Sequence, residues 1–110
     1  SGSRPPPFTS LKFLREPSDV VVARGGSVFL ECAAESDSGI PDIFWEKDSE
    51  ILDLESDERR KKFPNGSLWI GNVVHSRHHK PDEGNYRCRA TLKNVGSIVS
   101  RAAKVMVAGG

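Results

Sequence analysis

The side chains in this chain that could carry out chemistry are two cysteines and three histidines. His75, His78 and His79 lie close together, and an H-x-x-x-H spacing can bring two imidazoles to one metal ion. A tetrahedral site needs three or four ligands held on a rigid element, so a solvated loop is the favoured interpretation and we expect no metal. Cys32 and Cys88 are the only cysteines, and both are assigned to one disulfide.

Other catalytic patterns are missing from the sequence. It has no G-x-S-x-G motif and no glycine-rich phosphate loop. Ten acidic residues and one lysine crowd into residues 35–58, where no base accompanies the carboxylates. The sequence therefore predicts a protein that is not an enzyme and that binds no cofactor.

The spacing of the cysteines around one tryptophan and one tyrosine predicts the fold. Cys88 follows Cys32 by 56 residues, Trp45 lies 13 residues after Cys32, and Tyr86 lies two residues before Cys88. In an immunoglobulin-type sandwich these positions are a disulfide between strands B and F, a strand C tryptophan packed on it, and a tyrosine corner. We predict an all-β, immunoglobulin-like (I-set type) Greek-key sandwich with a Cys32–Cys88 bridge, which implies an oxidising compartment.

The run that leads into the tyrosine completes this core signature. Asp82 and Gly84 precede Tyr86 in a D-x-G-x-Y-x-C pattern. We expect Asp82 to pair with Arg59 or Arg60 and to pin the end of the sandwich where the connection between strands E and F turns. This role for Asp82 is structural rather than functional.

A length of 110 residues leaves room for one domain. Residues 1–10 are rich in proline and serine and are predicted to be flexible, residues 11–108 are predicted to form a single immunoglobulin-like domain, and residues 109–110 are either the start of a linker or a cut end. No apolar run approaches the roughly 20 residues of a membrane span. Alternating patterns predict strands around Cys88 and Val105 and, earlier in the chain, at 13–17, 19–23, 28–32, 43–47, 51–52, 59–63 and 67–70.

Strand parity predicts an aromatic surface. If Cys32 and Leu68 point into the core, Phe29 and Trp69 point out of it. Strands B and E are neighbours in the A-B-E-D sheet, so the two aromatic rings are expected side by side on its outer face. They form either a cross-strand pair covered by long side chains or a protein interface, since exposed aromatic residues often anchor one.

Charge is segregated along the chain. Residues 35–58 carry a net charge of −9 and residues 59–110 one of +9. The predicted turns gather basic side chains at the pole of the E–F connection, so binding of heparan sulfate is the alternative function, because arginine and lysine bind sulfate groups well. No nucleic-acid partner is expected. The candidate heparin contacts are Arg24, Arg59, Arg60, Arg77 and Lys80.

Asn65-Gly66-Ser67 is both a turn and a glycosylation sequon. Asn-Gly is typical of a hairpin with positive φ at both central positions. An exposed hairpin tip is accessible to the transferase, so we expect a glycan on Asn65.

Five stretches carry a resemblance to a known family. They are residues 16–19, 24–26, 34–37, 65–68 and 75–84, of which the last, HSRHHKPDEG, is the most specific. Together they are similar to the first immunoglobulin domain of the DCC/neogenin netrin receptor family. The resemblance implies the extracellular part of a single-pass plasma-membrane receptor that acts in axon guidance and adhesion.

The same resemblance implies partners. They are sibling immunoglobulin domains of the same receptor and, for the intact receptor, guidance proteins of the netrin, repulsive guidance molecule or draxin class. N-terminal immunoglobulin domains of such receptors fold back on one another, which favours docking through Phe29 and Trp69.

Overall fold

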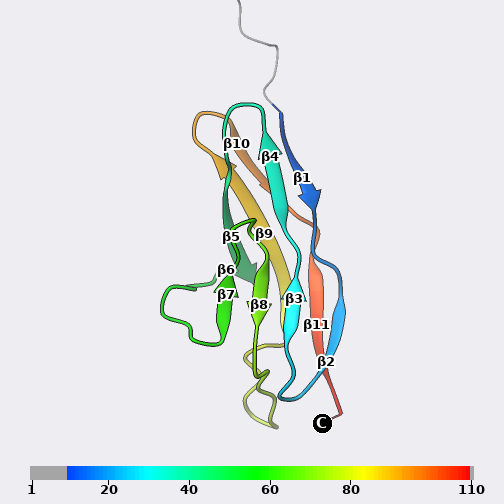
Figure 1. Ribbon diagram of the computed structural model, residues 1–110. Coiled ribbons are helices and arrows are strands. Elements are labelled where there is room, and N and C mark those ends of the chain that lie inside the picture. The colour runs from blue at the N-terminus through cyan, green and yellow to red at the C-terminus, as the bar shows by residue number, and fades with distance from the viewer. Residues whose placement is uncertain (1–9, 110) are drawn as a thin grey trace, which may run out of the picture.

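Two layers of β-strands make up the part of the chain that the computed structural model describes, residues 10–109 (Figure 1). The predicted flexible segment 1–10 therefore lies, except for Ser10, outside the described residues, as does Gly110. Among residues 10–109 no helical segment could span a lipid bilayer. The strands are β1 (Leu11–Arg15), β2 (Val20–Ala23), β3 (Val28–Leu30), β4 (Ala33–Ser36), β5 (Asp42–Lys47), β6 (Glu50–Ile51), β7 (Arg60–Lys62), β8 (Leu68–Ile70), β9 (Gly84–Leu92), β10 (Gly96–Val99) and β11 (Ala103–Ala108).

The pairing of the strands confirms the predicted all-β immunoglobulin-like sandwich. One layer has the order β2-β11-β9-β5-β6, with β10 also paired to β9. The other layer consists of β3-β8-β7 and the pair β1-β4. All pairs are antiparallel except β2 and β11. The chain thus starts in one layer with β1 and moves to the other with β2.

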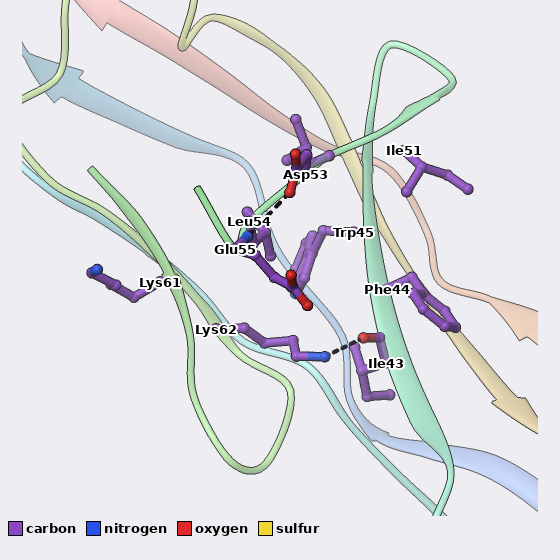
Figure 2. Close-up of a pocket in the computed structure, with 10 residues that line it drawn as sticks. Ile43, Phe44, Trp45, Ile51, Asp53, Leu54, Glu55, Lys61 and Lys62 are labelled. Carbon is purple, nitrogen blue, oxygen red and sulfur yellow. Dashed lines mark hydrogen bonds between the residues drawn. The ribbon is translucent and has the colours of Figure 1, made fainter. Parts of the chain in front are cut away.

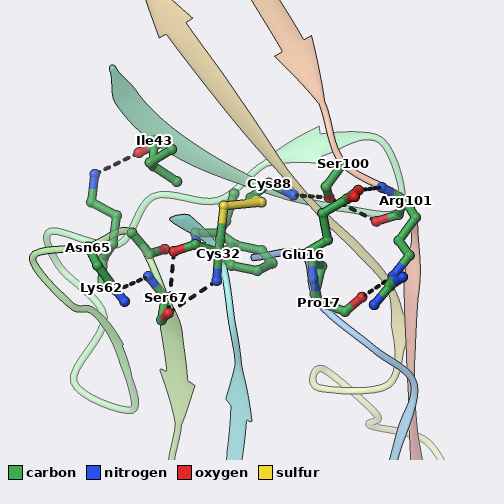
Figure 3. Close-up of a disulfide and its surroundings, with 12 residues drawn as sticks. Glu16, Pro17, Cys32, Ile43, Lys62, Asn65, Ser67, Cys88, Ser100 and Arg101 are labelled. Atoms are coloured by element: carbon green, nitrogen blue, oxygen red, sulfur yellow. Dashed lines mark hydrogen bonds between the residues drawn. A yellow bond between two sulfur atoms is a disulfide. The ribbon is translucent and has the colours of Figure 1, made fainter. Parts of the chain in front are cut away.

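The crossing from β1 to β2 is held by the segment between β10 and β11. Pro17 is buried at the crossing and has no N–H to donate to a ladder. Its carbonyl accepts a 2.8 Å hydrogen bond from Arg101 Nε, and Glu16 Oε1 accepts one of 2.9 Å from the Arg101 N–H (Figure 3). These bonds satisfy backbone groups that neither sheet pairs at this point.

The core lies between the layers and follows the predicted alternation. Trp45, Tyr86 and both cysteines are completely buried, and Cys32 and Cys88 form the predicted disulfide. The Trp45 indole donates to the Gly66 carbonyl at 2.7 Å, which gives its buried N–H a partner. Phe29, between two buried neighbours on β3, is 49% exposed.

Strand B departs from the prediction because it is divided. A continuous strand over 28–32 was expected, but β3 ends at Leu30 and β4 begins at Ala33. In the gap the Cys32 N–H donates to the hydroxyl of Ser67, which is buried, at 3.1 Å. The Cys88 N–H likewise donates to the Ser100 hydroxyl at 3.0 Å. Side-chain oxygens thus complete the hydrogen bonding of both disulfide-linked residues (Figure 3).

The hairpin between β7 and β8 also differs from its prediction. Only Gly66 has a positive φ, 109°, whereas Asn65 does not. Gly66 N–H donates to the Phe63 carbonyl and Phe63 N–H to the Ser67 carbonyl. The loop is therefore three residues long, with glycine in the left-handed position, rather than a two-residue Asn-Gly turn. A Cβ at Gly66 would lie 2.7 Å from Ile43 Cγ1, so glycine is also required by the close packing.

Asp82 ties together one pole of the sandwich. Its carboxylate is completely buried and accepts hydrogen bonds from Arg59 at 2.8 and 3.1 Å, from Arg60 at 2.9 Å and from the Val74 N–H at 2.7 Å. The Tyr86 hydroxyl donates to the Asp82 carbonyl at 2.8 Å, as a tyrosine corner requires. The pairing with an arginine was expected, and the structure shows both arginines engaged.

The surroundings of Asp82 lower the pKa of its carboxyl. Burial alone would raise the pKa, but the hydrogen bonds from Arg59 and Val74 and the charges of Arg59 and Arg60 outweigh burial. The pKa of the Tyr86 hydroxyl changes in the opposite direction, because burial raises it to about 12. The corner therefore combines an ionised carboxylate with a protonated hydroxyl at neutral pH.

Replacing Asp82 with Asn should destabilise the domain by about 3–5 kcal/mol, because Arg59 and Arg60 lose the buried carboxylate that they share. Chemical denaturation measures this loss. Glu35→Gln removes the partner of Lys12 in a pair whose side chains are both at least half exposed, and should cost less than about 1 kcal/mol. Equal losses in the two variants would contradict the central role of Asp82.

Acid should unfold the domain partly through Asp82. A carboxyl whose folded pKa is lowered stabilises the fold above the unfolded value of about 3.9, and this stability is lost as pH falls through the folded pKa. Melting temperatures measured below about pH 5 should therefore decline more steeply in the wild type than in Asp82→Asn. Parallel declines would show that other carboxylates carry the acid sensitivity.

Candidate interaction surfaces

The outer face of the β3-β8-β7 sheet carries three aromatic side chains. Phe29 on β3 is opposite Trp69 on β8, which is opposite Lys61 on β7. Phe63 follows β7 with the same parity as Lys61. Phe29 and Phe63 are 49% and 44% exposed, and their rings meet edge to face with centroids 5.3 Å apart. Phe29, Phe63 and Trp69 are called the aromatic face below.

The ring contact differs from the expected pair. Phe29 and Trp69 are neighbours in register, as predicted, but Phe29 makes its aromatic contact with Phe63. The Trp69 indole lies along its own strand over Gly71, where a Cβ would overlap the ring. Trp69 is consequently half-buried. Phe63 was missed by the sequence analysis, although its two-residue spacing from Lys61 on the same strand was the available signal.

The structure divides the five cations of the predicted basic pole into two groups. Arg59 and Arg60 turn toward Asp82, and their side chains are only 28% and 12% exposed. Arg24, Arg77 and Lys80 are exposed and line one hollow of about 270 Å³ with His75 and Ser76. The E–F loop and the end of β11 lie at this same end of the molecule in Figure 1. The structure therefore brings together three of the five predicted cations as a surface cluster.

The histidines do not gather into one site. His75 Nε2 lies 3.4 Å from Glu83 Oε1, and Glu83 Oε2 accepts a 2.9 Å hydrogen bond from the Val107 N–H. His78 and His79 are exposed. Within the described part of the chain, no group of three or more His, Cys, Asp or Glu side chains could hold a metal ion. His75 instead contributes to a link between the E–F loop and β11.

A cleft opens at the side of the sandwich between β5-β6 and β7 (Figure 2). It encloses about 590 Å³, and its walls include Trp45, Leu52 and Leu54. Lys62 Nζ donates to the Ile43 carbonyl at 2.6 Å and so joins the two layers across this opening. The lining contains no serine, cysteine or histidine.

The sequon lies at an exposed position, as its predicted role requires. Asn65 is exposed at the tip of the β7-β8 hairpin, and its Oδ1 accepts a 2.9 Å hydrogen bond from the Ser67 N–H. Ser67 itself is buried against Cys32.

Gly84, the remaining residue of the core signature, has φ of 154°, and a Cβ there would lie 2.6 Å from Asp48 Oδ2.

Comparisons with known proteins agree with the immunoglobulin-like fold described above. A family model described as an immunoglobulin domain matches residues 6–91. The netrin receptor DCC of Rattus norvegicus is 63% identical over 103 residues, which are 94% of this chain, and neogenin of Mus musculus is 57% identical over 102 residues, or 93%. A solved structure of tandem Ig repeats of Dlar superposes with a TM-score of 0.76 at 29% identity, covering 92% of this chain and 49% of that one.

These matches confirm the resemblance predicted from the sequence motifs. The chain spans only 7% of the length of DCC and of neogenin, so the similarity concerns one domain of much longer proteins. The chain belongs to the immunoglobulin domain family, and over nearly its whole length it is similar to an immunoglobulin domain of the netrin receptors DCC and neogenin.

Proposed function

We propose that the chain is a non-catalytic, extracellular recognition module of a cell-surface guidance receptor, and that it docks on proteins through the aromatic face. The parent protein is a single-pass plasma-membrane receptor in which this is the first immunoglobulin domain. Its partners are sibling immunoglobulin domains and, for the intact receptor, guidance proteins of the netrin, repulsive guidance molecule or draxin class. The similarity to DCC and neogenin supports this assignment.

The observation that carries the proposal is the exposure of two paired phenylalanines. Phe29 and Phe63 remain 49% and 44% exposed although they contact each other. An edge-to-face pair contributes about 0.5–1.5 kcal/mol to stability, and burial of both rings by a partner would add to it. Trp69 lies in register between Phe29 and Lys61, so a third aromatic side chain lies beside the pair, and aromatic residues are enriched at protein interfaces.

The double variant Phe29→Ser, Phe63→Ser tests the aromatic face. The isolated domain should stay folded, with a loss of roughly the 1 kcal/mol that the pair contributes. A fragment with the following immunoglobulin domains should become more extended in X-ray scattering or lose affinity for one of the guidance proteins. The matched control is Phe44→Ser, Ile51→Ser, because these side chains are 43% and 69% exposed elsewhere on the surface.

An unchanged scattering profile together with unchanged affinities for all ligands would contradict the proposal. Equal effects in the control variant would also contradict it, because they would show a general response to the loss of surface apolar groups. A change confined to the Phe29 and Phe63 variant supports it.

A second candidate function is binding of heparan sulfate at the pole. The observation that favours it is the hollow lined by Arg24, Arg77 and Lys80, three cations on two segments that are distant in sequence. Sulfate groups accept charge-assisted hydrogen bonds from such side chains. Arg59 and Arg60 are excluded from this candidate site, because both are paired with Asp82 and Arg60 is also paired with Asp57.

The triple variant Arg24→Ala, Arg77→Ala, Lys80→Ala should elute from a heparin column at clearly lower salt than the wild type, because screening leaves only close contacts effective. The control Arg87→Ala, Lys93→Ala, Lys104→Ala removes the same charge from other exposed positions and should elute almost unchanged. If both variants shift equally, retention reflects net charge alone and the pole is not a site.

A further inference from the structure

A groove lies beside the hairpin that carries Asn65. It encloses about 400 Å³ between β1, the start of β4, the segment before β5 and the β7-β8 hairpin. Its apolar walls include Leu14, Ile40, Pro41 and Pro64, and Asn65 is itself one of the lining residues.

Two of the aliphatic side chains in this groove are strongly exposed. Ile40 is 91% exposed and Leu14 is 54% exposed. Single exposed aliphatic residues are common on protein surfaces, but these two line one hollow together with two proline rings. Neither the sandwich core nor the aromatic face uses them. Among residues 10–109, no side chain covers this apolar part of the groove.

The position of Asn65 in the groove indicates one occupant, a glycan attached to this residue. Asn65 Oδ1 is held by the Ser67 N–H at 2.9 Å, which fixes the carboxamide plane. The other carboxamide atom, Nδ2, is the atom that carries an N-linked glycan. The attachment point and the apolar walls thus belong to the same hollow.

We propose that the innermost sugars of an N-linked glycan on Asn65 lie in this groove against Leu14 and Ile40. This inference rests on the predicted occupancy of the sequon and is independent of the aromatic face. In the transfer step Nδ2 loses a proton and bonds to C1 of the first N-acetylglucosamine. The bond from C1 to the lipid-linked diphosphate donor breaks, and the diphosphate leaves with the electron pair.

A tethered sugar needs little intrinsic affinity to occupy the groove. Covalent attachment makes the contact intramolecular, so its effective concentration is high. The rings of N-acetylglucosamine have faces of C–H groups, and placing them on aliphatic and proline side chains removes apolar surface from water. The hydroxyls at the ring edges stay hydrated, because the hollow is open to solvent.

The test uses protein secreted from a eukaryotic host, with intact mass to establish one glycan on Asn65. Native treatment with an amidase removes the glycan and converts Asn65 to Asp, which keeps an oxygen for the Ser67 N–H. The glycosylated form should melt a few degrees higher than the treated form. Nuclear Overhauser effects should connect the innermost sugar to the methyl groups of Leu14 and Ile40.

Two variants separate the groove from general effects of glycosylation. In Leu14→Ser, Ile40→Ser the melting difference between the two glycoforms should largely disappear. In the control Val21→Ser, Ile51→Ser, which alters side chains 65% and 69% exposed outside the groove, the difference should persist. An equal difference in all three proteins, the absence of sugar-to-methyl contacts, or an unmodified Asn65 would each overturn the proposal.

Discussion

The disulfide between Cys32 and Cys88 is the constraint on which the rest of the sandwich depends. It joins the two layers at their centre, where Trp45 is completely buried. Closing a loop of this length stabilises a domain by roughly 4 kcal/mol in the chain-entropy model. The bridge also requires both cysteine N–H groups to find partners in a dry core. Serine hydroxyls supply them, Ser67 for Cys32 and Ser100 for Cys88.

Ser67 consequently serves two purposes. Its hydroxyl completes the hydrogen bonding at Cys32 from a position 35 residues away, and the same residue is the third position of the sequon. The hydroxyl is buried in the folded domain, whereas Asn65, the first position of the sequon, is exposed. The hairpin that exposes Asn65 therefore belongs to the core on one side and to the surface on the other.

Much of the fold could be predicted from the sequence, because a strand in a sandwich has one buried side. Alternation correctly assigned Cys32 and Leu68 to the core and Phe29 to the surface. The division of strand B could not be predicted, since it depends on a hydroxyl from the β8 side of the layer. The position of Phe63 depends on the register of a hairpin whose loop proved three residues long. The division of strand B is set by a contact between strands and leaves no local pattern, whereas the outward direction of Phe63 could have been predicted from its two-residue spacing from Lys61.

The basic side chains at the candidate pole could likewise be predicted only in part from the sequence. The sequence grouped Arg59 and Arg60 with Arg24, Arg77 and Lys80, because the start of the predicted strand 59–63 was expected at the same end of the sandwich as the turn at Arg24 and the E–F connection. A buried carboxylate needs cationic or N–H partners, and Asp82 takes two arginines for that purpose. The surface cluster that remains is smaller and lies beside Glu83, which holds the Val107 N–H on β11.

The two candidate binding surfaces, the pole and the aromatic face, lie at different places on the sandwich. The pole lies where the chain leaves β11, so any element that follows Ala108 can cover Arg24, Arg77 and Lys80 or extend their surface. The aromatic face lies on the β3-β8-β7 sheet, whereas β11 belongs to the opposite layer. A partner on the aromatic face therefore contacts a surface that the continuation of the chain does not occupy at its point of exit. Docking there and anion binding at the pole can vary independently, because they use different side chains, while Arg59 and Arg60 are paired with Asp82 and Asp57.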